Sequence, residues 1–149
     1  MDYTIRNDSL TLTIRSIGAE KKTLVSSKGI HYLRQPDKYW DRVAPFLFPN
    51  VGKLKGNSTF INGKEFHLPQ HGFLRDQEFE LLHHLEDEIA LISFYNEETL
   101  KQFPFKYKAI VHYQLKESKL ITKISITNED SIPMPFNIGG HPGFYCPIY

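Results

Sequence analysis

Two of the seven histidines, His71 and His141, stand in segments unlike those around the others. Each follows a stretch that contains proline, and each is followed at once by glycine or proline and then, shortly after, by phenylalanine. Imidazole titrates near neutral pH, so one group can both donate and accept a proton within a reaction cycle. Two imidazoles held on rigid turns therefore predict a small-molecule site that performs proton chemistry.

A third candidate, Lys53, belongs to an apolar, proline-fixed segment, residues 44–54, which precedes the His71 segment. Between the two segments lies Asn62-Gly63, flanked by alternating runs. This dipeptide is the strongest short-range signal for a β-hairpin, because a type I′ turn needs a positive φ at both central positions. We therefore expect a hairpin between the segment that carries the cation and the segment that carries the first imidazole.

The remaining histidines show no metal-binding pattern in the sequence. They are His31, His67, His83, His84 and His112. His67 stands four residues before His71, as helical zinc ligands do, but Pro69 between them forbids that helix. His83 and His84 are neighbours in a predicted strand, so their side chains point to opposite faces. With one cysteine and no His-Glu-x-x-His motif, we expect no metal site.

Alternating apolar and polar residues predict that most of the chain is β-strand. The predicted strands cover residues 10–15, 30–33, 58–61, 64–68, 78–85, 88–95, 105–116 and 120–127. The one predicted helix covers residues 96–103 and is stopped by Pro104. These elements predict an all-β fold, a mostly antiparallel sandwich of about nine or ten strands. We expect one domain, residues 1–149.

The composition limits the classes of partner. The 149 residues are 40% hydrophobic and 23% charged, with a net charge of +1, which gives no electrostatic reason to expect nucleic acid or a membrane as partner. Cys146 is the single cysteine, residues 1–6 lack the apolar core of a signal peptide, and no apolar run reaches membrane-spanning length. We therefore expect a cytoplasmic protein without an internal disulfide.

The last residues, 144–149, are aromatic and apolar and carry no charged side chain, whereas chain ends are usually polar and frayed. This pattern predicts a sheet interrupted before completion, and a chain that is the N-terminal part of a longer one. An unfinished edge also predicts self-association. Trp40, the single tryptophan, has two interpretations, a core residue or a surface on which a sugar ring stacks.

These segments together resemble the aldose 1-epimerase (mutarotase) family, specifically its shorter bacterial branch. The similarity lies in the order and spacing of pieces that are individually weak. They are Gly18-Ala19-Glu20, Trp40 before Ala44-Pro45, Phe48-Pro49-Asn50-Val51-Gly52-Lys53-Leu54, Asn62-Gly63-Lys64-Glu65-Phe66, Leu68-Pro69-Gln70-His71-Gly72-Phe73, Arg75-Asp76, Glu78-Phe79 and Asn137-Ile138-Gly139-Gly140-His141-Pro142.

The resemblance implies a large, twisted antiparallel β-sandwich of the galactose mutarotase type and the interconversion of the α and β anomers of an aldose, with a small-molecule sugar as partner and no cofactor. Family histidines at the positions of His71 and His141 bind the sugar, and the second protonates its ring oxygen. The family usually has arginine at the position of Lys53, and lysine lacks the bidentate fork of that guanidinium. The family's catalytic glutamate has no matching position in this chain.

Two alternatives to a free-sugar mutarotase remain open. Relatives that act on hexose phosphates share a Gln-His-Gly-Phe-x-Arg pattern, in which Arg75 would contact the phosphate, although a surface salt bridge explains Arg75 equally well. The other alternative is a carbohydrate-binding or regulatory module that does not catalyse.

Overall fold

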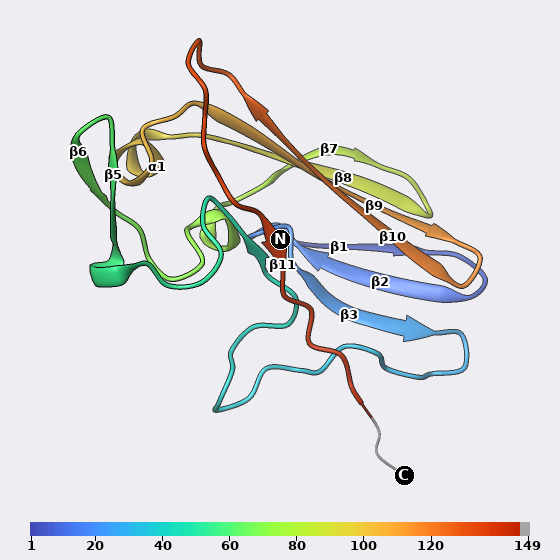
Figure 1. Cartoon of the computed structure of the whole chain (residues 1–149). Coiled ribbons are helices and arrows are strands. Elements are labelled where there is room, and N and C mark those ends of the chain that lie inside the picture. The colour runs from blue at the N-terminus through green and yellow to red at the C-terminus, as the bar shows by residue number, and fades with distance from the viewer. Residues whose placement is uncertain (147–149) are drawn as a thin grey trace.

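The structure is a computed structural model and describes residues 1–146. Two antiparallel sheets face each other and enclose the core (Figure 1). The predicted all-β sandwich is therefore confirmed. Within residues 1–146, no helix is both long and apolar enough to cross a membrane.

The first sheet has the strand order β1-β2-β3. Its strands are β1 (Asp2–Arg6), β2 (Leu10–Arg15) and β3 (Lys21–Ser26). The alternation predicted for β2 is present, because Leu10, Leu12 and Ile14 are buried. The strands β1 and β3 were not predicted from the sequence. The strand predicted at residues 30–33 is wrong, because His31 and Leu33 form only isolated bridges.

The second sheet has the order β10-β9-β8-β7. Its strands are β7 (Glu80–His84), β8 (Glu88–Phe94), β9 (Tyr107–Lys116) and β10 (Lys119–Asn128). In β9 every second side chain from Tyr107 to Leu115 is buried and the side chains between them are half-buried, as the alternation predicts. The predicted helix is α1 (Glu97–Gln102), begun by a capping box between Asn96 and Thr99.

The core lies between the two sheets. Buried apolar side chains of β1 and β2 meet those of β8 and β9, and the Tyr113 hydroxyl donates across the interface to the carbonyl oxygen of Ala19 at 2.7 Å. Phe48 stands at the centre of an aromatic cluster. The rings within 5.2–6.1 Å of Phe48 are those of Phe73, Phe103, Tyr107 and Phe136. The segment that carries Phe48 is therefore fixed by the core.

Two small sheets complete the fold. The strand β4 (Phe46–Leu47) pairs with β11 (Gly139–Gly140), and β5 (Ser58–Ile61) pairs with β6 (Lys64–His67). The two short 3-10 helices are η1 (Lys55–Asn57) and η2 (Leu74–Asp76). The hairpin predicted at Asn62-Gly63 is confirmed, because both residues have positive φ (50° and 77°) at the β5–β6 turn.

The interrupted sheet predicted at residues 144–149 can be compared with the structure only at residues 144–146, because residues 147–149 lie outside the described residues. Phe144 forms an isolated antiparallel bridge with Leu33, and the Tyr145 amide donates to the carbonyl oxygen of Tyr32 at 2.9 Å. The side chains of Phe144 and Tyr145 are exposed.

Candidate functional site

The segment 43–49 lies between the two histidine segments and pairs with both. On one side it runs antiparallel to residues 137–143, which include the strand β11 labelled in Figure 1. The His141 amide donates to the Pro45 carbonyl oxygen at 3.0 Å, and the Asn137 amide donates to the Pro49 carbonyl oxygen at 2.9 Å. These hydrogen bonds extend the β4–β11 pairing in both directions and fix His141 on one side of the segment.

On the other side the same segment meets the His71 segment. Phe48 forms a parallel bridge with Gly72, and its amide donates to the His71 carbonyl oxygen at 3.2 Å. Both His71 and Gly72 have a φ of 69°. A left-handed backbone is uncommon for histidine and stores strain, a feature often found where a side chain is held for function. Gly72 is required, because a Cβ atom there would lie 2.1 Å from the Phe48 carbonyl oxygen.

Glu20 anchors the beginning of this central segment. Its buried carboxylate accepts hydrogen bonds from the amides of Val43 and Ala44, both at 2.8 Å, and forms an ion pair with Arg15. A fully buried carboxylate is stable only when its oxygens are satisfied in this way. The role of Glu20, part of the Gly-Ala-Glu piece in the sequence, is therefore to position the segment.

This arrangement brings the two imidazoles together. The ring centroids of His71 and His141 are 6.2 Å apart, with planes inclined by 39°. His71 is half-buried and His141 is exposed. Two polar rings at this separation can contact neighbouring oxygen atoms of one small ligand.

The tautomer of His71 is set by the backbone beside it. The Gly52 amide donates to Nδ1 of His71 at 3.0 Å, and the Gly52 carbonyl oxygen accepts from the His71 amide at 2.8 Å. An Nδ1 that accepts leaves the proton of a neutral imidazole on Nε2. Nε2 of His71 is therefore the nitrogen that can donate to a ligand.

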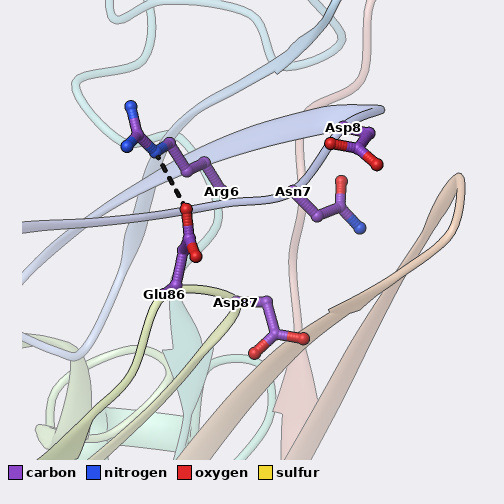
Figure 2. Close-up of a pocket in the computed structure, with 5 residues that line it drawn as sticks. All are labelled: Arg6, Asn7, Asp8, Glu86 and Asp87. Carbon is purple, nitrogen blue, oxygen red and sulfur yellow. Dashed lines mark ion pairs between the residues drawn. The ribbon is translucent and has the colours of Figure 1, made fainter.

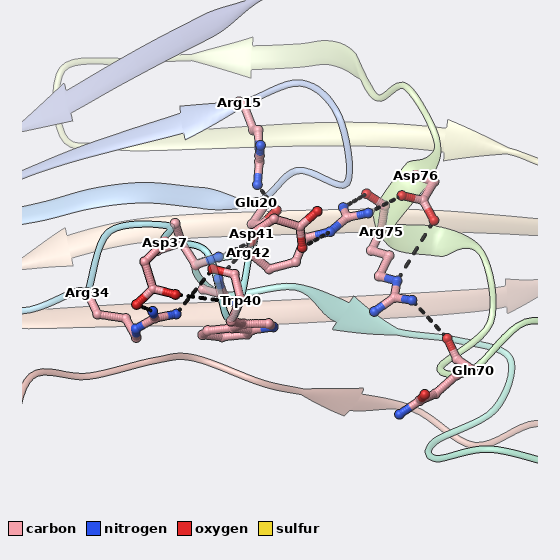
Figure 3. A network of polar contacts seen from close by, with 12 residues as sticks. Arg15, Glu20, Arg34, Asp37, Trp40, Asp41, Arg42, Gln70, Arg75 and Asp76 are labelled. Atoms are coloured by element: carbon pink, nitrogen blue, oxygen red, sulfur yellow. Dashed lines mark hydrogen bonds and ion pairs between the residues drawn. The ribbon is translucent and has the colours of Figure 1, made fainter.

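Arg75 lies beside this imidazole and is held in place by a polar network. Its Nη2 donates to the Gln70 carbonyl oxygen at 2.9 Å, and its Nε lies 3.8 Å from Oδ2 of Asp76. Arg42 binds the same Asp76 carboxylate and also donates to the Arg75 carbonyl oxygen (Figure 3). Both interpretations of Arg75 thus have a structural basis, because it is part of an ion-pair network and is also next to the histidine pair.

The environment favours the neutral form of His71. Partial burial lowers the pKa of this imidazole below its usual value, and the positive charges of Arg75 and His141 lower it further. A neutral imidazole with its proton on Nε2 is a hydrogen-bond donor that carries no charge. This state suits contact with a sugar hydroxyl or ring oxygen.

We expect the His71 ring to titrate below the usual histidine pKa of 6.5. Because its folded pKa is lower than its unfolded pKa, its contribution to stability is present above pH 6.5 and is lost as the pH falls through the folded value. The ring-proton NMR signal of His71 measures the midpoint, and His71→Asn should remove this part of the acid sensitivity. A midpoint at or above the usual value would contradict the burial argument.

Trp40, for which the sequence allowed either a core position or a contact with a sugar ring, adds an aromatic surface beside His141. It is half-buried, and its ring centroid is 5.1 Å from that of His141. The Arg34 guanidinium lies 5.0 Å from the same ring. A Cβ atom at Gly143 would come within 2.6 Å of Trp40, so this glycine lets the ring pack against the backbone. Gly143, two residues after His141, is the sequence feature that could have indicated the position of Trp40 beside this histidine.

Lys53 is exposed and directly follows Gly52, the residue that binds His71. Its ammonium forms no hydrogen bond or ion pair with other residues in the described part of the chain. The structure therefore brings Lys53 near His71 through the backbone, without a side-chain contact between the two.

A separate hollow lies at the turns that end β1 and β7 (Figure 2). It is lined by Arg6, Asn7, Asp8, Glu86 and Asp87. Arg6 pairs with Glu86 at 3.5 Å, and both side chains are largely exposed. An exposed ion pair of this kind contributes little to stability, and the hollow contains neither imidazole of the pair.

Comparisons with known proteins agree with this architecture. Residues 1–148 match the family described as Aldose 1-epimerase. A curated relative, the plasmid protein LacX of Lactococcus lactis subsp. lactis, is 30% identical over 155 residues, which cover 99% of this chain and 52% of LacX. The chain thus spans about half the length of the curated relatives that it matches.

Solved structures match the fold of this chain and, like the curated relatives, are about twice its length. The galactose mutarotase related enzyme of Lactobacillus acidophilus is 39% identical with a TM-score of 0.96, covering 99% of this chain and 50% of that one. A galactose mutarotase-like protein of Lactobacillus casei ATCC 334 is 35% identical with a TM-score of 0.96, covering all of this chain and 51% of that one. On the family match over residues 1–148, this chain belongs to the aldose 1-epimerase family.

Proposed function

We propose that His71 and His141 bind an aldose and supply the proton-donating part of a site that interconverts its α and β anomers. The observation that carries the proposal is the 6.2 Å separation of the two imidazoles, held from opposite sides of one core-anchored segment. Family membership supports the reaction class, and the geometry supports the residues.

The chemistry requires two proton transfers. The ring oxygen of the hemiacetal gains a proton as its bond to the anomeric carbon breaks, and the anomeric hydroxyl loses a proton as the carbonyl forms. The open-chain aldehyde then rotates, and the reverse transfers close the ring with the other configuration. A group that titrates near neutrality can give the first proton and take it back on closure.

We assign the donation to the ring oxygen to His141, which is exposed next to Trp40. His71, with the proton of its neutral form on Nε2, holds a neighbouring oxygen and stabilises negative charge that develops there. Trp40 offers a flat apolar surface against which the carbon face of the sugar can pack. Lys53 is proposed as an additional contact to sugar hydroxyls.

We propose no base within residues 1–146. Glu20 is fully buried and already accepts three partners, and Asp76 is held by Arg42 and Arg75. Neither imidazole of the pair forms an ion pair with a carboxylate in this part of the chain. An acid without its base binds sugar but opens the ring slowly, so the chain alone should bind better than it catalyses.

Two other functions use the same residues. A hexose phosphate is favoured by Arg75, whose guanidinium lies close enough to His71 to lower the pKa of that imidazole. In that case Arg75 binds the phosphate and the anomeric chemistry is unchanged. A module that binds carbohydrate without catalysis is favoured by the lack of a free carboxylate at the histidine pair within residues 1–146.

Trp40 provides the test, because it is the single tryptophan and contacts His141. We expect its fluorescence to change in a saturable way as an aldose is added, and His71→Asn to weaken that binding by about tenfold, the effect of one lost hydrogen bond to a ligand. Asparagine is chosen because it tolerates a left-handed backbone.

Polarimetry on the same samples separates the alternatives. Binding with conversion near the buffer rate is the expected result. Tighter binding of a hexose phosphate, lost in Arg75→Gln, would transfer the assignment to sugar phosphates. Rapid conversion by the 149-residue chain would contradict the proposed lack of a base, and no fluorescence change with any sugar would contradict the site.

A further inference from the structure

Three side chains with metal-binding atoms meet on the four-stranded sheet, outside the segments that carry His71 and His141. They are His83 in β7, Glu88 at the beginning of β8 and His112 in β9. One ligand atom from each lies within 4.8 Å of the others. Nε2 of His83 is 3.1 Å from Oε1 of Glu88, and Nε2 of His112 is 3.5 Å from its Oε2.

A β-bulge places His83 in this cluster. The pairing of β7 with β8 shifts between Leu81 and His83, so that His83 stands opposite Ala90 and Leu82 is the extra residue. Without the shift His83 would stand opposite Ile89, which is fully buried in the core. Bulges of this kind redirect side chains and are common beside functional sites.

The third strand completes the arrangement. His112 of β9 also stands opposite Ala90, from the other side. The two histidines therefore flank one alanine, on the sheet face opposite the core residue Ile89. Because Ala90 has only a methyl group, the two rings approach to 5.7 Å between centroids across it.

The hydrogen bonding of the cluster is incomplete in a way that points to a ligand. Nε2 of His83 is buried, and although it lies 3.1 Å from Oε1 of Glu88, the two atoms are not aligned as a hydrogen bond. Glu88 is oriented by Gln114, whose Nε2 donates to Oε2 at 3.2 Å. A buried nitrogen without a partner costs free energy, and coordination of a metal ion would satisfy it. The side chains of the three residues are 41%, 23% and 27% exposed, which leaves a path for an ion.

We propose that His83, Glu88 and His112 bind one divalent transition-metal ion, with Zn²⁺ as the representative. Two imidazole nitrogens and one carboxylate oxygen are ligands that Zn²⁺ prefers, whereas Mg²⁺ and Ca²⁺ prefer oxygen alone. Three protein ligands leave a fourth position for water. A bound ion would join the edge strand β7 to β9 across β8 and stabilise this end of the sheet. This site is independent of the proposed sugar chemistry.

A calorimetric titration of the metal-free chain with Zn²⁺ tests the proposal. We expect one ion per chain and a rise in the melting temperature when Zn²⁺ is present. His83→Ala and His112→Ala should each weaken binding about 100-fold or more, because loss of a ligand exceeds the 10–100-fold typical of a second-layer partner. Glu88→Gln keeps the shape of the side chain, removes its charge and should also weaken binding.

Two controls distinguish this cluster from other histidines. His31→Ala removes an exposed histidine elsewhere, and His71→Asn removes the other close imidazole pair; both variants should bind one Zn²⁺ as the parent does. Unchanged affinity in Glu88→Gln and His112→Ala, or no binding by the parent chain, would overturn the proposal. Loss of binding only in His71→Asn would assign the ion to the sugar site instead, and would also overturn it.

Discussion

Replacing His141 by alanine is expected to lower the rate of anomer interconversion about 10²–10⁴-fold, the usual contribution of a general acid. The suitable protein is a fusion of this chain to the half of the Lactobacillus acidophilus relative that the chain does not span. His141 is exposed, so the substitution removes the proton donor without opening a cavity in the core. Polarimetry or NMR exchange between anomer signals measures the rate.

The matched control for His141 is His67→Ala, which removes an exposed histidine of β6. It should leave both turnover and sugar affinity unchanged. A loss of turnover below about tenfold in His141→Ala, under conditions where chemistry limits the rate, would remove His141 from the role of acid. Equal losses in the two variants would point to a general effect on folding.

The largest expected effect on stability is that of Gly72→Ala. A Cβ atom at this position would lie 2.1 Å from the Phe48 carbonyl oxygen and 2.4 Å from its carbon. Phe48 is fully buried within the aromatic cluster, so its backbone cannot move away without disturbing the core. We expect a loss of about 2–4 kcal/mol in the free energy of unfolding, from the clash together with the left-handed φ.

Gly63→Ala separates the two causes. Gly63 has a similar φ of 77°, but a Cβ atom there, at the hairpin turn, would meet no atom within 4 Å. The free energy of unfolding of Gly63→Ala should therefore fall only by the cost of backbone strain, about 1–2 kcal/mol. Urea unfolding of both variants gives the comparison, and equal losses would show that the contact between Gly72 and Phe48 relaxes easily.

Local signals made much of the fold predictable from the sequence. The alternation in β9 continues through ten residues because one of its faces is buried in the core. The Asn62-Gly63 turn was predictable because its backbone geometry depends on two residues alone. The helix α1 likewise depends on neighbours in the chain, with its cap at Asn96 and a proline after its end.

The missed strand β3 shows where such signals fail. Its first residue, Lys21, is buried, although lysine usually indicates an exposed position. Its ammonium lies 5.0 Å from the Phe46 ring and 5.1 Å from the Tyr113 ring, and burial lowers its pKa to about 8. Aromatic rings from distant segments create this position, so no pattern within β3 could reveal it.

The two candidate sites also depend partly on local sequence and partly on distant segments. His71 and His141 could be selected from the sequence because each has an unusual local setting, but the distance between their rings depends on the pairing of their segments with residues 43–49. The cluster of His83, Glu88 and His112 depends on a bulge and on the register of three strands. Patterns between neighbours in the chain therefore could not reveal this cluster.

NMR of the histidine rings during a sugar titration shows whether one sugar contacts both His71 and His141. We predict that the ring-proton signals of these two residues shift together with one dissociation constant, while those of His31, His67 and His84 stay in place. We also predict that His141→Ala weakens the shift at His71. Independent shifts with different dissociation constants, or no shift at either ring under saturating sugar, would contradict a shared site.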